Sequence, residues 1–325
     1  MKIVIPLAGR GTRLRPHTHT KPKPLFHIAG KAVLGHILDS IKGIKFDEII
    51  FITGHMGEQI EAYVKKRYDF PCRFIEQKEL KGQAHAIWLA REHIKDDVVI
   101  WFVDTISDGT LKVLDAVKED GAIFAGRVDD PERFGVVVPD KDNIVKEILE
   151  KPELPPSNLV NIGLYYVKDS KLMFDCIRTL IEKNKARKGE FYLMDAFQMM
   201  ISKGTKFKVI EVKSWEDVGK PEAALATNRF FLNNGLTKQP ECENSVIIPP
   251  VYIEDGVEVK NSIIGPYVSV AKGAQIMNSI VKDSIIGKHA HVHDAQIHRS
   301  LIGDNALLKG TYRRYNIGDD SDVEY

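Results

Sequence analysis

The residues best suited to chemistry lie near the start of the chain, where a short apolar run ends in a turn of small residues. Residues 3–7 are predicted to form a strand, and Ala8, Gly9 and Gly11 follow it. Small residues let the backbone approach a ligand closely. Consecutive backbone N–H groups in such a turn attract anions. The sequence therefore predicts an anion-binding turn at the end of the first strand.

Cationic side chains follow this turn at once. They are Arg10, Arg13, Arg15, Lys21 and Lys23. Prolines at positions 16, 22 and 24 stiffen the stretch and keep it out of a helix. A glycine turn followed by a stiff cationic loop is suited to holding a polyphosphate. The spacing is neither that of the P-loop nor that of the dinucleotide-binding GxGxxG motif.

An acidic residue completes this set of candidates. Asp104 comes directly after the apolar run 98–103, which is predicted to be a strand. A carboxylate at the carboxyl end of a strand, facing a polyphosphate loop, is a natural ligand for Mg²⁺. Asp104 is therefore a candidate Mg²⁺ ligand, and a helix cap or a solvated loop acid is the alternative.

Strands and helices alternate through the first two thirds of the chain, and they must position these residues. Strands are expected at 48–53, 72–76, 98–103, 144–149, 161–167 and 207–212, with two more inside 122–138. Helices are expected at 32–41, 57–68, 83–94, 170–184, 193–202 and 219–234. This alternation predicts an α/β fold with a Rossmann-like, mixed and mostly parallel sheet. Ligands of such sheets bind beyond the carboxyl ends of the strands.

The sequence pattern changes at about residue 245, where short repeats begin. Ser-Ile-Ile-Gly occurs at 262–265 and 284–287, and Ser-Leu-Ile-Gly at 300–303. Apolar residues fall every six positions, as Ile264, Val270 and Ile276, then Ile286 and Val292, then Ile302 and Leu308. This period is typical of a short left-handed parallel β-helix, and an irregular β-sandwich is the alternative. We expect a catalytic domain at 1–235, the β-helix at 236–311 and a polar tail at 312–325.

Histidines cluster in one of the repeats. His289, His291 and His293 alternate, and His298 lies nearby. A period of two places three imidazoles on one strand face, where they could bind zinc. No acid or cysteine completes a ligand set in the sequence, so a solvated or interface face is favoured.

Composition narrows the classes of partner. The 325 residues include 46 Lys and Arg against 45 Asp and Glu, which gives a formal net charge of +1. Such a balance predicts no nucleic-acid partner and no attraction to anionic membranes, and no apolar stretch is long enough for a membrane span. Cys72, Cys176 and Cys242 lie far apart, which favours a reducing, cytoplasmic location.

Several motifs resemble those of the sugar-1-phosphate nucleotidyltransferases, also called nucleotide-sugar pyrophosphorylases. That family opens with a strand, a small-residue turn, Gly-Thr-Arg and a Pro-Lys about ten residues on, as this chain does up to Lys23. The resemblance continues through the stretches Asp130–Val136, Glu150–Pro152, Gly189–Asp195 and Trp215–Gly219. Met194 departs from the family pattern, which has threonine there. The resemblance covers nearly all of the chain.

The resemblance implies a reaction and a set of roles. An NTP and a sugar 1-phosphate would yield an NDP-sugar and pyrophosphate, with Mg²⁺ as cofactor. The implied catalytic residues are Arg13, on the β- and γ-phosphates, and Lys23, near the α-phosphate. The implied nucleotide-binding residues are Ala8, Gly9, Gly11, Thr12, Gln77 and Gly82. The implied sugar-phosphate-binding residues are Gly135, Glu150, Lys151 and Asn161. The implied metal ligands are Asp104 and Asp217.

The family leaves the choice of substrates open. Pro6 and Ala8 resemble UTP–glucose-1-phosphate uridylyltransferases, whereas the β-helix resembles longer thymidylyltransferases. The donor and acceptor of the Gln77 amide match the edge of uracil or thymine, so UTP or dTTP with glucose 1-phosphate is expected. A mannose-1-phosphate guanylyltransferase and a non-catalytic regulatory or scaffold homologue are the alternatives, and the intact phosphate-binding residues favour an enzyme. Exposed end coils of the β-helix predict a homo-oligomer.

Overall fold

The structure, a computed structural model, describes residues 1–107, 111–187, 189–213 and 215–311. The polar tail expected at 312–325 lies outside the described residues. The chain divides into two compact units. The first comprises residues 1–26 and 31–227, and the second comprises residues 27–30 and the chain from Asn228 onward. The domain boundary expected at residue 235 stays a prediction.

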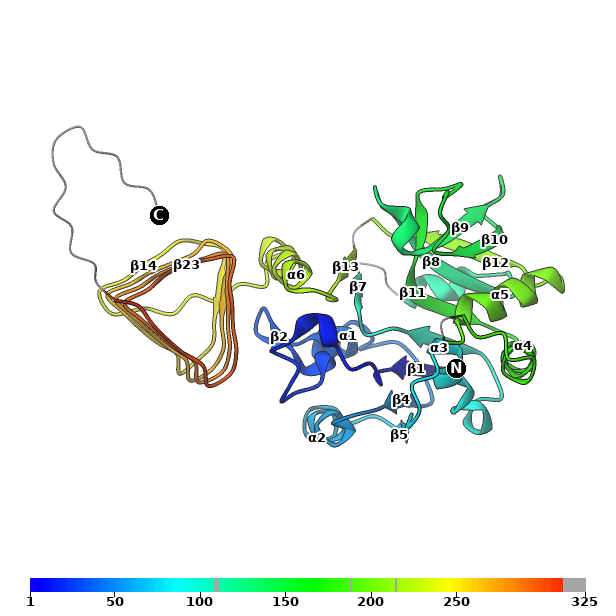
Figure 1. Ribbon diagram of the computed structural model, residues 1–325, viewed down its shortest axis with the longest axis horizontal. Helices are drawn as coiled ribbons and strands as arrows, with labels where there is room; N and C mark the ends of the chain where they lie inside the picture. Colours follow the sequence, from blue (N-terminus) through cyan, green and yellow to red (C-terminus); the bar gives the residue numbers. More distant parts are fainter. Residues whose placement is uncertain (108–110, 188, 214, 312–325) are drawn as a thin grey trace. The chain divides into compact units, whose positions relative to one another are not determined.

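A nine-stranded sheet forms the frame of the first unit (Figure 1). Its main path runs β10-β9-β11-β6-β1-β4-β5, and β8 joins β11 to β12. The strands are β1 (Lys2–Pro6), β4 (Ile49–Thr53), β5 (Cys72–Glu76), β6 (Val98–Trp101), β8 (Gly121–Arg127), β9 (Gly135–Pro139), β10 (Val145–Glu150), β11 (Leu159–Val167) and β12 (Phe207–Glu211). Strands β5, β4, β1 and β6 pair in parallel, whereas β11 is antiparallel to β6, β8 and β9. The expected mixed α/β fold is confirmed.

Six α-helices are found among the described residues. They are α1 (Val33–Ser40), α2 (Gly57–Arg67), α3 (Gln83–Trp88), α4 (Ser170–Glu182), α5 (Leu193–Ser202) and α6 (Pro221–Asn233). Buried residues of α3, α4 and α5, such as Ile87, Ile177 and Phe197, form one apolar cluster with Val4, Ile50 and Ile100 of the sheet. Packing between these apolar residues therefore holds α3, α4 and α5 against the sheet. None of the helices is long and apolar enough to cross a bilayer.

The helix expected over 83–94 is shorter than predicted. After Trp88 the chain tightens into 3₁₀ turns, with Leu89 N–H donating to the Ala86 carbonyl at 3.3 Å and a 3₁₀ helix at Arg91–His93. The Arg91 guanidinium donates to the Trp88 carbonyl at 3.2 Å and lies 4.6 Å from the centre of the Trp88 ring. The arginine therefore satisfies a carbonyl that a longer α-helix would have used.

Three parallel sheets form the second unit, each with four strands, and the coils enclose a triangular outline (Figure 1). The first sheet is β14 (Val246–Ile247), β17 (Ile263–Ile264), β20 (Ile280–Lys282) and β23 (Gln296–His298). The second is β15 (Val251–Ile253), β18 (Val268–Val270), β21 (Ile285–Ile286) and β24 (Leu301–Ile302). The third is β16 (Glu258–Lys260), β19 (Gln275–Met277), β22 (His291–His293) and β25 (Leu307–Lys309).

The six-residue period places one apolar residue of each strand in the interior. Residues such as Ile264, Val270 and Ile276 are buried and belong to one apolar cluster. The stacked parallel strands confirm the expected architecture and fit a left-handed β-helix. The period is not strict, however, because hydrogen-bonded residues of successive coils lie 16 or 17 positions apart, where three six-residue repeats would give 18.

Side chains at two corners of the triangular outline bind successive coils together. The hydroxyl of Ser262 accepts a hydrogen bond from the Ser279 N–H at 3.1 Å, and Ser284 does the same for Ser300 at 3.0 Å. The amide of Asn261 donates to the Asn278 side-chain oxygen at 3.2 Å. Asn261 and Asn278 have positive φ values of 49° and 51°, a conformation that asparagine tolerates well. The recurring Asn-Ser pairs thus form a ladder along the stack.

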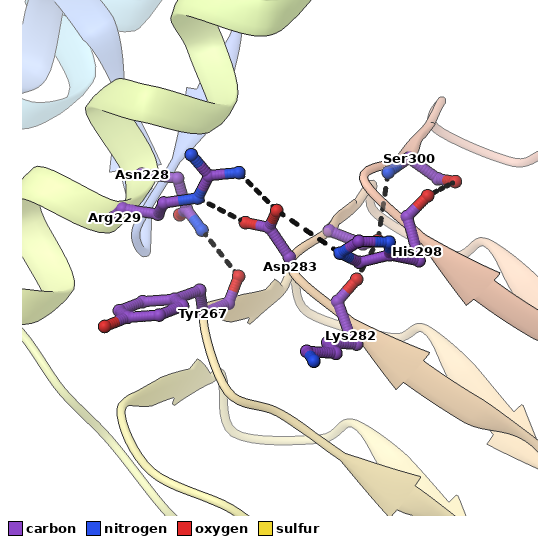
Figure 2. A network of polar contacts seen from close by, with 8 residues as sticks. Asn228, Arg229, Tyr267, Lys282, Asp283, His298 and Ser300 are labelled. Carbon is purple, nitrogen blue, oxygen red and sulfur yellow. Dashed lines mark hydrogen bonds and ion pairs between the residues drawn. The ribbon is translucent and has the colours of Figure 1, made fainter.

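The last residues of α6 bind the β-helix through a polar network (Figure 2). The Arg229 guanidinium donates to both carboxylate oxygens of Asp283, with 2.6 Å between Arg229 Nε and Asp283 Oδ1. Asn228 donates to the Tyr267 carbonyl at 3.1 Å, and the His298 ring lies 3.8 Å from the Asp283 carboxylate. The Asp283 side chain is only 6% exposed, so its carboxylate is shielded from water, whereas the Arg229 side chain is 34% exposed.

The histidine pattern is read only partly correctly from the sequence. His291 and His293 lie on β22, with ring centres 5.8 Å apart, as period two predicts. His289 lies outside the strand, with φ 53° at a corner, because period two requires an extended backbone. Within the described ranges no three His, Cys, Asp or Glu side chains gather closely enough to hold a metal ion.

Candidate active site

The turn after β1 forms one wall of a cavity of about 480 Å³. Ala8, Gly9, Gly11 and Thr12 all line it. Gly11 has φ 61°, and a Cβ there would lie 2.9 Å from the Cβ of Lys23, so no larger residue fits without a shift. The Gly11 carbonyl accepts a hydrogen bond from the Thr18 hydroxyl at 2.8 Å. The turn is therefore held rigidly with its backbone against the cavity, as an anion site requires.

The stiff cationic loop delivers Lys23 to the same cavity. Lys23 opens a 3₁₀ helix, Lys23–Leu25, preceded by Pro22 in an extended conformation. Its ammonium group lies 2.5 Å from the Asp104 carboxylate, which follows β6. The lysine side chain is 9% exposed and the aspartate side chain 45% exposed. The structure thus brings together a buried cation and an accessible carboxylate, at the carboxyl ends of two neighbouring parallel strands.

The backbone places Asp217 near this pair. Two short strands, β7 (Thr105–Ser107) and β13 (Trp215–Asp217), pair antiparallel with Asp217 opposite Thr105. The Val218 N–H donates to the Asp104 carbonyl at 3.1 Å. The side chain of Asp217 lies outside the part of the chain that the structure describes. The pairing nevertheless brings both expected metal-ligand positions to neighbouring points of the backbone.

Gln77 and Gly82 line the other end of the same cavity. Gln77 follows β5 and is only 5% exposed. Gly82 has φ 93°, and a Cβ there would lie 2.7 Å from the backbone of Phe191. Only glycine therefore lets the chain before α3 lie this close to the backbone of Phe191, which precedes α5.

A second cavity of about 250 Å³ contains the four residues expected to bind the sugar phosphate. Gly135 opens β9, Glu150 ends β10, and Asn161 lies within β11. The Asn161 amide donates to the Gly135 carbonyl at 2.9 Å. Burial raises the pKa of Glu150, and the charges of Lys151 and Arg187 partly oppose this shift. Lys151 is exposed, with φ 48°.

A bulge in β11 shapes this second cavity. The pairing with β8 shifts between Asn161 and Tyr165, and Gly163 between them has φ 82°. The freed Gly163 carbonyl accepts a hydrogen bond from Phe102 N–H at 2.8 Å, just before Asp104. A bulge re-aims side chains locally. Here it turns the strand so that Asn161 faces the cavity while the chain stays tied to the end of β6.

The two cavities share part of their lining. The shared residues are Arg13, Gln83, Phe102 and Asp104. Gln83 and Phe102 were not predicted from the sequence. Gln83 could have been suspected because it directly follows Gly82, which is expected to bind the nucleotide. Phe102 could not, because in the sequence it is only one more apolar residue of a predicted strand. A ligand in the larger cavity and a ligand in the smaller one would therefore approach each other at Arg13 and Asp104.

Comparison with known proteins places this arrangement in a family. The family model described as nucleotidyl transferase matches residues 2–234. The bifunctional protein GlmU of Methanocaldococcus jannaschii is 38% identical over 260 residues, which cover 79% of this chain and 61% of that protein. The chain thus matches about three fifths of the length of this relative.

Two further matches cover the other protein almost completely. The UTP–glucose-1-phosphate uridylyltransferase AglF of Haloferax volcanii is 32% identical over 230 residues, which cover 68% of this chain and 93% of that protein. A crystal structure from Bacillus anthracis, assigned as a glucose-1-phosphate thymidylyltransferase in complex with sucrose, has a TM-score of 0.61 at 25% identity. That match covers 71% of this chain and 94% of the other.

Proposed function

Because the chain belongs to the family of sugar-1-phosphate nucleotidyltransferases, we propose that it makes an NDP-sugar and pyrophosphate from an NTP and a sugar 1-phosphate. We propose UTP or dTTP as the nucleotide and glucose 1-phosphate as the sugar. The names of AglF and of the Bacillus anthracis structure support this choice, since both refer to glucose 1-phosphate.

The proposed chemistry is a single displacement at phosphorus. An oxygen of the sugar phosphate forms a bond to the α-phosphorus while the bond from that phosphorus to the β-phosphate oxygen breaks. Pyrophosphate leaves with the electron pair, and no covalent enzyme intermediate forms. Such a reaction depends on positioning and on neutralising charge more than on acid–base catalysis.

One observation carries the proposal, namely that the two cavities meet at Arg13 and Asp104. The NTP would lie in the larger cavity with its phosphates on the glycine turn, and the sugar 1-phosphate in the smaller one. Arg13 would hold the β- and γ-phosphates, where charge builds on the leaving group. Lys23 would contact the α-phosphate and the incoming phosphate oxygen.

The residues at the junction also fit the divalent metal that the family typically uses. The Asp104 carboxylate is accessible from the cavity and offers the hard oxygen donors that Mg²⁺ prefers. We propose Asp104 and Asp217 as its ligands. When bound, Mg²⁺ would neutralise negative charge on the phosphate oxygens.

The sugar would be recognised by groups that already hold one another in place. Asn161 is fixed between the Gly135 carbonyl and the Tyr165 hydroxyl. Glu150, whose side chain is 11% exposed, would accept hydrogen bonds from sugar hydroxyls. Lys151 would pair with the sugar phosphate. Because Asn161 and Glu150 are already positioned, these side chains would lose little conformational entropy when the sugar binds.

The proposal is tested by measuring pyrophosphate release with every pairing of UTP, dTTP, GTP, CTP and ATP with glucose 1-phosphate, N-acetylglucosamine 1-phosphate and mannose 1-phosphate. We expect the highest kcat/KM for UTP or dTTP with glucose 1-phosphate. A preference for GTP with mannose 1-phosphate would favour a guanylyltransferase instead. No release with any pair, in the presence of Mg²⁺, would favour a non-catalytic homologue.

A further inference from the structure

The Gln77 side chain is held in one orientation by the protein itself. Its amide nitrogen donates to the Gly82 carbonyl at 3.2 Å and lies 3.1 Å from Nδ1 of His85. A carbonyl oxygen can only accept hydrogen bonds, so the atom that faces it must be the nitrogen of the amide. The position of the Gly82 carbonyl therefore settles which end of the amide is which.

Both amide hydrogens of Gln77 are then used within the protein. One goes to the Gly82 carbonyl, which also accepts from the Ala86 N–H at 3.1 Å and so lies at the start of α3. The other goes to His85 Nδ1, which must be unprotonated to accept it. The imidazole is thus neutral, with its proton on Nε2. Burial and the nearby Lys81 both lower the pKa of His85, which favours this state.

The remaining polar atom of the side chain is Oε1. It has no hydrogen-bond donor among the described residues, although Gln77 is almost fully buried and lines the nucleotide cavity. Because Gln77 lines the cavity, a ligand bound there can donate a hydrogen bond to this oxygen. The amide expected to offer both a donor and an acceptor to the base thus offers the acceptor alone.

We propose that His85 is a positioning residue that fixes the Gln77 amide with its oxygen toward the nucleotide base, and so selects bases that carry a ring N–H. The proposal rests on the proposed function, because it takes the larger cavity to be the NTP site. Uracil and thymine carry N3–H and guanine carries N1–H, so each can donate to Oε1. Cytosine and adenine present an unprotonated ring nitrogen at the equivalent place, which would face the oxygen as a second acceptor.

Replacing His85 tests the proposal through base selectivity, a readout that general loss of packing would not change. His85→Phe keeps a ring but removes one of the two acceptors that hold the amide nitrogen of Gln77. Only the Gly82 carbonyl then favours the wild-type orientation, so the amide presents its nitrogen to the base more often. We expect kcat/KM for UTP to fall about 10- to 100-fold, mainly through KM, and the UTP-to-CTP ratio to fall at least about tenfold.

A conservative variant and a matched control accompany it. Asparagine places its side-chain oxygen where His85 has Nδ1, so His85→Asn should keep the UTP-to-CTP ratio within about threefold of wild type. His93→Phe makes the same change of side chain in the 3₁₀ helix after α3, away from Gln77, and should leave the ratio unchanged.

Calorimetric binding of UTP and CTP to the whole chain separates failure of this inference from failure of the proposed function. A His85→Phe variant with an unchanged UTP-to-CTP ratio overturns the inference, whatever its total activity. A wild-type protein that releases no pyrophosphate but binds UTP over CTP in a His85-dependent way rejects the reaction and supports the inference. A protein that binds neither nucleotide overturns both.

Discussion

Lys23 Nζ lies 2.5 Å from Asp104 Oδ1, although Lys23 opens a 3₁₀ helix in the loop after β1 and Asp104 lies in the turn after β6. The lysine is nearly buried, and an ammonium group out of water needs a partner. Asp104 supplies it in this state of the protein. Under the proposed function, negative charge on the bound phosphates would take over that role and leave the carboxylate available for Mg²⁺.

Removing the Asp104 charge should therefore slow the reaction. For Asp104→Asn we expect kcat to fall at least about 100-fold, because charge stabilisation in the transition state is lost. NTP binding measured without metal should change little. Steady-state kinetics and binding check this, with the exposed Asp142→Asn as control. Turnover within threefold of wild type would remove Asp104 from the site.

The Gln77 acceptor also predicts how the enzyme ranks nucleotides. UTP and dTTP should be used with kcat/KM within about tenfold of each other, since a methyl group is worth only about 1 kcal/mol. GTP should be at least about thirtyfold poorer, because the second donor of guanine is left without a partner. Gln77→Glu should weaken both pyrimidine nucleotides. Kinetics with glucose 1-phosphate measure the ranking, and a preference for GTP contradicts it.

Nucleotide affinity should fall in acid through His85. Burial and Lys81 lower its pKa below the ordinary 6.5, and Glu79 opposes this only in part. Below that pKa the ring gains a proton on Nδ1 and can no longer accept from Gln77. KM for UTP should thus stay flat above pH 6.5 and rise, by up to about tenfold per pH unit, below the pKa of His85.

The His85→Asn variant is the control for this pH profile. Substrate phosphates titrate near pH 6 and affect KM in both proteins. Only the wild-type protein has an imidazole at position 85, so any difference between the two profiles comes from this group. Profiles of the two proteins that coincide between pH 5 and 7 would contradict the role of His85.

Much of the site could be predicted from local sequence, because strand ends and glycine turns leave local signals. Gly11 and Asp104, which these signals singled out, both line the larger cavity. The contact of Lys23 with Asp104 and the shared lining at Phe102 could not be predicted, since they follow from the order of strands in the sheet. His289 was misplaced because a residue with φ 53° breaks the alternation that period two assumes.

The outer face of the first β-helix sheet supports the expected oligomer. Val246, Ile263 and Ile280 lie side by side on neighbouring strands and are exposed. We expect an oligomer with an even number of copies, held in part by this apolar column. Light scattering at tens of micromolar measures the mass. Replacing Ile263 and Ile280 with Lys should lower it, whereas replacing the exposed Leu154 should not. A monomeric wild-type chain contradicts the prediction.

The network in Figure 2 predicts a stability effect. Asp283→Asn keeps the shape of the side chain and tolerates the φ of 48°, so it removes the charge and one of the two acceptors without a change of backbone. We expect the free energy of unfolding to fall by about 1–3 kcal/mol, because the Arg229 guanidinium, 34% exposed, loses its bidentate partner.

Thermal unfolding of the full chain measures this change. Asp255→Asn is the matched control, since Asp255 also pairs with a cation, Lys238, but is 84% exposed. Its effect should be under about 1 kcal/mol. Equal effects of the two substitutions would show that burial of the Asp283 carboxylate adds nothing to the stabilising free energy of its ion pair.

The ladder of Asn and Ser side chains has a consequence for how this half of the molecule can evolve. Between Ser245 and Ser279 each coil offers the next one the same side-chain partner that it takes from the coil before it, and this ladder ends at Ala295, which has no hydroxyl. A tandem duplication of one coil would therefore arrive with its hydrogen bonds and its inward apolar residues already matched. The stack can thus gain or lose one such coil within this stretch without redesign of the rest.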